Sequence, residues 1–186
     1  MSNQLTPTTK VVTGKVRFSY LHAFEPKAIE EGSEPKYSVC LLISKSDTYT
    51  LKKVNEAIDN AFNAGKAKFG GKLPTKWKHP LRDGDEERPD DEAYENCYFI
   101  NANSKTKPGL VNKSMNAIID PDELYSGCYG RASVNFYAFN TAGNKGVACG
   151  LNNLQKLADG ERLSGGSTAE EDFGDLPFED EGDDLL

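Results

Sequence analysis

The sequence has few of the residues from which enzymes usually build reactive or metal-binding sites. It contains two histidines and four cysteines, and the cysteines (Cys40, Cys97, Cys128 and Cys149) stand far apart along the chain. This spacing matches neither a zinc site nor a redox motif, so we expect reduced cysteines that pack as small hydrophobic side chains. No pair of nucleophile and base can be assigned. The sequence therefore predicts a protein that is not an enzyme and holds no cofactor.

Long apolar stretches are also missing. No run of apolar residues approaches the ~18–20 that a membrane-spanning helix requires. Residues 1–10 are polar and lack the apolar stretch of a signal peptide. We therefore expect a soluble, cytoplasmic protein.

Acidic residues are abundant, but most of them lie in two short segments. The chain of 186 residues has a net charge of −7. Its last 27 residues, Gly160–Leu186, hold ten acidic residues and one arginine, and Asp83–Glu95 holds eight acidic residues and one arginine. All other residues together carry a net charge of +9. A basic body joined to an acidic tail favours a nucleic-acid-binding protein whose tail competes for the same surface.

Hydrophobic periodicity predicts a mainly β domain with one helix. Apolar residues recur every three or four positions from Asp47 to about Lys68, which indicates an amphipathic helix with Asp47 as its N-cap. Alternating or β-rich segments predict five strands at Val11–Phe24, Tyr37–Ile43, Tyr94–Asn103, Tyr129–Asn140 and Val147–Leu157. The segment Phe69–Arg88 has no periodicity and is expected to be an irregular loop.

The order of these elements favours a small antiparallel barrel or sandwich. There is no alternation of strands and helices and no internal repeat. We expect one domain over residues 1–160 and a disordered acidic tail over residues 161–186.

Aromatic and basic residues alternate at several positions. Single strands are bound by base stacking on aromatic rings and by phosphate contacts to lysine and arginine. Arg131 lies between Tyr129 and Tyr137 on one face of a predicted strand. The alternative is that these tyrosines cover a second hydrophobic layer beneath the helix.

The irregular loop carries a second such group. Lys76 and Lys78 flank Trp77, the only tryptophan, and Arg82 follows. Trp77 is either a stacking platform for a base or an apolar anchor that holds the loop to the domain.

The two faces of each predicted strand separate further candidate residues into core positions and exposed positions. In the first strand, Phe18 and Tyr20 share the face of Val16 and are expected in the core, whereas Arg17 points outward. In the third strand, the adjacent Tyr98 and Phe99 must point in opposite directions. Asn101 and Asn103 share the Phe99 side, so we expect that side to be exposed and Phe99 to contact nucleic acid.

The acidic cluster allows two other hypotheses. Asp83, Asp85 and Glu86 offer oxygen ligands, so a metal-dependent nuclease is one alternative, although Arg88 occupies the position where an EF-hand needs glycine. An interaction module whose acidic regions mimic DNA is the other.

Four segments carry a resemblance to a known family: Trp77–Asp85, Tyr98–Val111, Tyr125–Asn140 and Gly146–Arg162. With them the chain resembles the single-stranded DNA-binding proteins of double-stranded DNA bacteriophages, an OB-fold family. The resemblance implies a five-stranded OB-type barrel that binds single-stranded DNA without sequence preference, during phage replication or recombination in the host cytoplasm. The oligomeric state stays open, a homodimer included. The expected DNA contacts are Arg17, Lys76, Trp77, Lys78, Arg82, Phe99, Lys105, Lys107, Tyr129, Arg131 and Tyr137.

The tail is similar to the acidic tips of bacterial single-strand binders, which end in Pro-Phe. The residues that carry this similarity are Asp172, Phe173, Asp175, Pro177 and Phe178, but here eight further residues follow. A disordered tail of this length would reach roughly 30 Å. We therefore expect the tail to compete with DNA and, once displaced, to recruit phage or host replication and recombination proteins.

Overall fold

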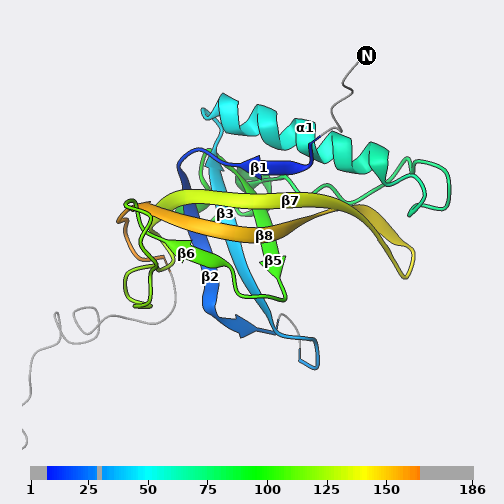
Figure 1. Ribbon diagram of the computed structural model, residues 1–186. Helices are drawn as coiled ribbons and strands as arrows, with labels where there is room; N and C mark the ends of the chain where they lie inside the picture. The colour runs from blue at the N-terminus through cyan, green and yellow to red at the C-terminus, as the bar shows by residue number, and fades with distance from the viewer. Residues whose placement is uncertain (1–7, 29–30, 164–186) are drawn as a thin grey trace, which may run out of the picture.

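The strands form a closed ring of hydrogen-bonded pairs, with one long helix along its side (Figure 1). The computed structural model describes residues 8–28 and 31–163. The long strands are β2 (Val16–Lys27), β3 (Lys36–Ser44), β5 (Cys97–Ser104), β7 (Tyr129–Thr141) and β8 (Asn144–Ala158). The short elements are β1 (Lys10–Val12), β4 (Arg82–Asp83), β6 (Gly109–Val111), α2 (Gly84–Glu87) and the 3₁₀ helix η1 (Glu92–Tyr94).

The ring follows the order β2, β3, β5, β8, β7 and returns to β2. All neighbours are antiparallel except β5 and β8, which are parallel. The predicted mainly β fold with five principal strands is therefore confirmed, with one parallel pair where an all-antiparallel barrel was expected. β1 pairs with β7, and β6 extends the other edge beside β8.

The helix α1 (Thr48–Ala64) lies between β3 and β5 in the chain, as predicted. The side chain of Asp47 accepts a hydrogen bond from the Thr50 amide at 3.1 Å and so caps the first turn. The apolar stripe packs against β1, β7 and β8. Its buried members include Val54, Ile58 and Ala61.

The core fills the interior of the ring with the alternate residues of each strand. Phe18, Ile43 and Phe136 are all at most 1 % exposed. Burial of such a side chain stabilises the fold by roughly 1.5–3 kcal/mol. The buried face predicted for the fourth strand is confirmed at Ala132, Val134, Phe136 and Ala138.

The first predicted strand differs from expectation in two ways. It is divided into β1 and β2 at Thr13–Lys15. Within β2 the register shifts between Ser19 and His22, and Tyr20 has a φ of 45°. This irregularity turns Tyr20 outward, where it is 54 % exposed, so its expected place in the core was wrong.

The irregular loop is docked onto the ring at two points. Lys78 forms a parallel bridge with Gly146 at the start of β8, and β4 pairs with Phe99 and Tyr98 of β5. The loop therefore runs from the start of β8 to β5.

None of the helices in the described ranges is both long and apolar enough to cross a membrane. The predicted tail contacts, Asp172, Phe173, Asp175, Pro177 and Phe178, lie outside the described residues.

Candidate nucleic-acid interface

The outer face of β2, β3 and β5 carries three rows of side chains that point away from the core. Strand register defines these rows. The first row contains Arg17, Leu42 and Phe99. The second row contains Ser19, Cys40 and Asn101. The third row contains His22, Ser38 and Asn103. In OB-folds this face and the two hairpin loops beside it bind oligonucleotides.

The first row is covered by residues 83–95, here called the acidic segment. Tyr94 is 2 % exposed and meets the ring of Phe99 edge-on, with centroids 5.2 Å apart. The guanidinium groups of Arg82 and Arg88 lie 5.2 and 5.7 Å from the centroid of the Phe99 ring. Phe99 is consequently 1 % exposed, and the expectation that it is an exposed DNA contact was wrong.

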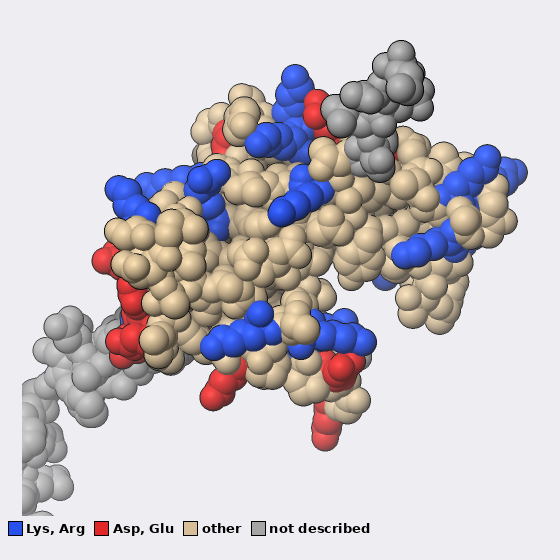
Figure 2. Space-filling view, in the orientation of Figure 1, with Lys and Arg blue, Asp and Glu red and all other residues tan. Residues whose placement is uncertain are grey.

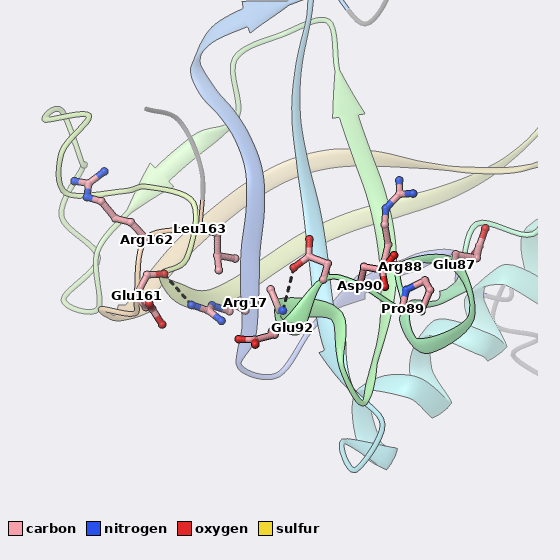
Figure 3. Close-up of a pocket in the computed structure, with 11 residues that line it drawn as sticks. Arg17, Glu87, Arg88, Pro89, Asp90, Glu92, Glu161, Arg162 and Leu163 are labelled. Carbon is pink, nitrogen blue, oxygen red and sulfur yellow. Dashed lines mark hydrogen bonds between the residues drawn. The ribbon is translucent and has the colours of Figure 1, made fainter. Parts of the chain in front are cut away.

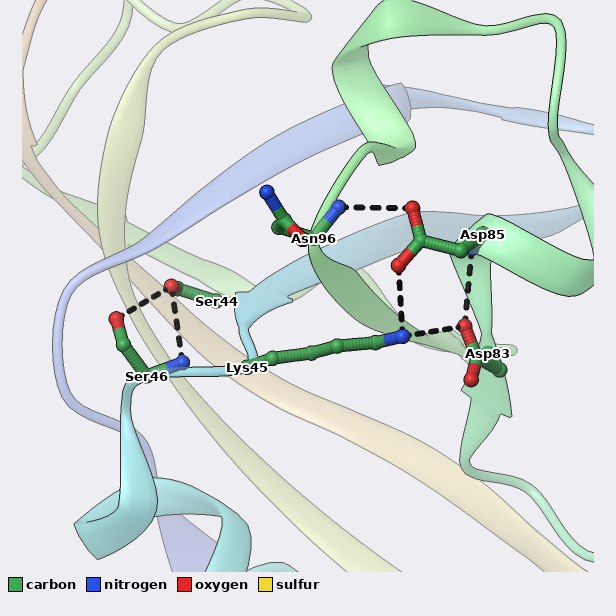
Figure 4. Close-up of polar contacts among 6 residues, drawn as sticks. All are labelled: Ser44, Lys45, Ser46, Asp83, Asp85 and Asn96. Atoms are coloured by element: carbon green, nitrogen blue, oxygen red, sulfur yellow. Dashed lines mark hydrogen bonds and ion pairs between the residues drawn. The ribbon is translucent and has the colours of Figure 1, made fainter.

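Lys45 holds the acidic segment to the corner between β3 and α1 (Figure 4). Its ammonium group lies 2.8 Å from Oδ1 of Asp83 and 2.7 Å from Oδ2 of Asp85. These hydrogen bonds lower the pKa of both carboxyl groups and raise the pKa of Lys45. Asp85 also accepts a hydrogen bond from the Asn96 amide at 3.0 Å.

This geometry gives the nuclease hypothesis no support. The Lys45 ammonium occupies the space between the carboxylates where a metal ion would have to lie. Within residues 8–28 and 31–163, no group of three or more histidine, cysteine, aspartate or glutamate side chains is arranged to hold a metal ion.

A hollow of about 740 Å³ lies between the acidic segment and the last described residues (Figure 3). Arg17 at its edge donates hydrogen bonds to the carbonyl oxygens of Gly127 at 3.0 Å and Glu161 at 2.8 Å. Its guanidinium group therefore joins the start of β2 to the segments just before β7 and just after β8. Five acidic side chains line the hollow beside three arginines, which makes it a poor site for phosphate: Glu87, Asp90, Asp91, Glu92 and Glu161.

In the second row, Ser19 and Cys40 are buried and Asn101 alone is exposed. Asn101 and the third row line another hollow, of about 320 Å³. Its polar lining comes from three neighbouring strands and comprises Tyr20, His22, Lys27, Ser38, Asn101 and Asn103. Desolvation, and secondarily the nearby Lys27, lower the pKa of His22 and so favour its neutral imidazole.

The open face continues across β5 onto the β7–β8 hairpin. Asn103 is the register partner of Gly150, and a Cβ placed on Gly150 would lie 3.7 Å from Cε1 of the Tyr137 ring. Tyr137 is 40 % exposed. We call this surface the polar strip; it comprises Tyr20, His22, Ser38, Asn101, Asn103, Gly150 and Tyr137.

Lysines border the polar strip on two sides. Lys105 and Lys107 lie on the β5–β6 connection, against the β2–β3 hairpin: Lys105 is 3.4 Å from Glu34, and Lys107 is 5.6 Å from the ring centroid of Phe24. Lys78 adjoins the β7–β8 hairpin at Gly146. Figure 2 shows basic side chains on both sides of the hollow between the two hairpins.

The other expected contacts lie away from the strip. Trp77 packs against the core and stacks on Phe62, an arrangement that favours its alternative role as a loop anchor. Tyr129 lies beneath Lys15 and Arg17 at the far end of β7. Arg131 donates to the Thr13 carbonyl at 3.2 Å, Lys76 is exposed on the loop, and Arg82 pairs with Glu87.

Sequence reasoning missed Tyr20, His22 and Ser38 as candidates. The bulge that exposes Tyr20 leaves no mark on the apolar alternation of the first strand. The prediction that Asn101 and Asn103 are accessible is confirmed, because the acidic segment does not extend over them.

The chain is similar to known phage proteins along most of its length. Residues 9–186 match the model of a family described as Enterobacter phage Enc34, ssDNA-binding protein. Putative protein p50 of Acyrthosiphon pisum secondary endosymbiont phage 1 is 30 % identical, with 92 % of this chain and 96 % of that protein covered.

Solved structures show the same fold. The single-stranded DNA-binding protein from bacteriophage Enc34, in complex with single-stranded DNA, superposes with a TM-score of 0.75 at 25 % identity, covering 88 % of this chain and 97 % of that one. The gp2.5 single-stranded DNA-binding protein of bacteriophage T7 reaches a TM-score of 0.60 at 11 % identity, covering 90 % of this chain and 94 % of that one, and shows a likeness of fold alone. The chain therefore belongs to the family of phage single-stranded DNA-binding proteins that is typified by the Enc34 protein.

Proposed function

We propose that this protein binds single-stranded DNA along the polar strip, without catalysing a reaction on it, during phage replication or recombination in the host cytoplasm. The main support for the proposal is that two exposed tyrosines, Tyr20 and Tyr137, lie on the same outer face. Between them lie polar side chains, and lysines border the strip. Membership of a family named for binding single-stranded DNA supports it independently.

Two physical terms supply the affinity. A base stacked on an aromatic ring contributes ~1–3 kcal/mol, so the two tyrosines together contribute roughly 2–6 kcal/mol. Lys27, Lys78, Lys105 and Lys107 neutralise backbone phosphates. The salt slope is that of the logarithm of the binding constant against the logarithm of salt concentration. For a single strand each phosphate contact adds about −0.7 to it, so four contacts give a slope of about −3. Because neither term depends strongly on base identity, binding is largely independent of sequence.

The acidic segment confines DNA to the strip. It covers the first row of the outer face and carries exposed carboxylates, among them those of Glu86, Asp90 and Glu92. These carboxylates repel phosphate. A strand therefore crosses the face over the second and third rows, between the two hairpins.

The acidic tail competes with DNA for the same lysines. Leu163, the last described residue, packs against the cluster of Cys40, Leu42, Tyr94 and Phe99, so the tail begins beside the outer face. Tethering places its carboxylates near the strip at an effective concentration of about millimolar. DNA displaces the tail, which then recruits replication or recombination proteins.

Fluorescence anisotropy of labelled oligonucleotides tests both parts. The full chain should bind single-stranded DNA more tightly than duplex DNA, with affinity that falls as salt rises, and should leave DNA intact when Mg²⁺ or Mn²⁺ is added. Deleting Ser164–Leu186 should raise the affinity at low salt. Equal or weaker binding after the deletion would refute the competition by the tail, and failure to bind any single strand would refute the function itself.

A further inference from the structure

The floor of the hollow beneath Tyr20 has an unusual set of side chains for a phosphate-binding surface. Among its described lining residues, Lys27 carries the only permanent positive charge. The remaining polar groups are the amides of Asn101 and Asn103, the hydroxyl of Ser38 and the imidazole of His22. Serine, asparagine and tyrosine side chains also contact phosphate, but the neutralisation of its charge, which drives phosphate binding, comes from lysine and arginine. This floor is therefore suited to an uncharged ligand with hydrogen-bonding edges.

The amides lie at defined positions on adjacent strands. Asn103 is directly opposite Ser38, and Asn101 is directly opposite Cys40, in the antiparallel β3–β5 pair. Side chains of directly opposed residues have Cβ atoms about 4.5–5.5 Å apart. Rigid strands thus hold two amides and one hydroxyl within reach of a single small planar group.

These groups are not used by the protein itself. In the ranges 8–28 and 31–163, no side-chain hydrogen bond engages Ser38, Asn101 or Asn103. Other asparagines are engaged: Asn60 and Asn140 donate to backbone carbonyl oxygens, and Asn153 accepts from the Gly109 amide. Each amide of the floor therefore keeps one acceptor oxygen and two donor hydrogens for a ligand.

Tyr20 adds an aromatic ring to the lining of the hollow. A positive φ is rare for a residue with a side chain and costs of order 1–3 kcal/mol, and such outliers cluster at functional sites. Here the residue with a φ of 45° carries an exposed aromatic ring and lines the hollow. An aromatic ring beside polar groups is the arrangement with which proteins stack an unpaired base and bind its edge.

We propose that Tyr20, Ser38, Asn101 and Asn103 form a nucleobase subsite, in which one base of the bound strand stacks on Tyr20 and its edge hydrogen-bonds to the two amides and the hydroxyl. The inference rests on the proposed binding of single-stranded DNA. It adds a modest dependence on base identity at one position, because a base that covers an amide and leaves it without a partner binds less well than one that pairs with it.

The test compares homopolymeric strands of each base with a matched strand that has a sugar-phosphate backbone without bases. Wild-type protein should prefer some homopolymers over others by roughly 2- to 12-fold, the range expected for one hydrogen-bonded group. The double variant Asn101→Ala/Asn103→Ala should lose this preference. Its affinity for the strand without bases and its salt slope should equal those of the wild type.

Asn63→Ala is the matched control, because Asn63 is an exposed asparagine on α1, away from the strip. Thermal melting of all variants confirms that each is folded. Equal affinity of the wild type for all homopolymers would overturn the subsite, as would a double variant that keeps the wild-type base preference. Those results would leave the proposed function intact, whereas absence of binding to every strand would refute the function.

Discussion

Trp77 stacks on Phe62 of α1, with ring centroids 4.3 Å apart and planes inclined by 21°. On another side the Trp77 ring meets His79, at a centroid distance of 5.0 Å. The only tryptophan of the chain is thus enclosed by its own loop and by the helix. We propose that it fixes the loop in which the next residue, Lys78, bridges to Gly146 at the edge of the polar strip.

Trp77→Leu should therefore reduce stability more than DNA affinity. We expect a loss of about 1–3 kcal/mol in the free energy of unfolding, below the roughly 3–5 kcal/mol for truncation of a fully buried aromatic side chain. Urea denaturation and anisotropy titration measure the two effects. A folded variant of unchanged stability that binds DNA much more weakly would instead identify Trp77 as a stacking platform.

The two exposed tyrosines of the strip should behave in the opposite way. Tyr137→Leu and Tyr20→Leu should each weaken binding of single-stranded DNA by roughly 5- to 150-fold, because each removes a stacking platform worth ~1–3 kcal/mol. Tyr49→Leu is the control, since Tyr49 is 66 % exposed on α1, away from the strip. Equal effects of all three substitutions would show that the loss of DNA affinity is not specific to the polar strip.

The contact of Lys45 with Asp83 and Asp85 should make stability depend on pH. Both carboxyl groups have a pKa below the ordinary value of 3.8, so they contribute stability above that pH and lose it as the pH falls through their lowered pKa values. Lys45→Met should lower the melting temperature at neutral pH. The difference from the wild type should close below pH 3.8.

Lys52→Met provides the control for this series, because Lys52 is an exposed lysine on α1. A deficit of Lys45→Met that persisted unchanged in acid would mean that lost packing, and not the ion pairs, causes it.

Neutralising the exposed carboxylates of the acidic segment should strengthen DNA binding. Glu86→Gln, Asp90→Asn and Glu92→Gln together remove three negative charges beside the strip. We expect a higher affinity at low salt and a smaller gain at high salt, since exposed charges are screened over about 8–10 Å near physiological ionic strength. Anisotropy titration at several salt concentrations measures the gain. A lower affinity would show that DNA crosses the acidic segment itself.

The sequence predicted the parts of this fold that follow from patterns within single helices or strands. The helix stripe from Val54 to Ala61 and the buried face from Ala132 to Ala138 follow from periodicity within single elements, and both were predicted. Phe99 was misplaced because its cover, Tyr94 and Arg88, comes from a neighbouring segment whose folding back depends on Lys45. Tyr20 was misplaced because a bulge reverses the direction of its side chain. The site therefore depends on contacts between segments, which periodicity does not report.

The path of the strand can be tested directly by photo-cross-linking of the full chain to single-stranded DNA that contains 5-iododeoxyuridine, followed by mass spectrometry of the cross-linked peptides. Our account predicts cross-links at Tyr20 and Tyr137, on either side of the polar strip. Cross-links confined to Trp77 and Tyr129, with none at the strip, would contradict it.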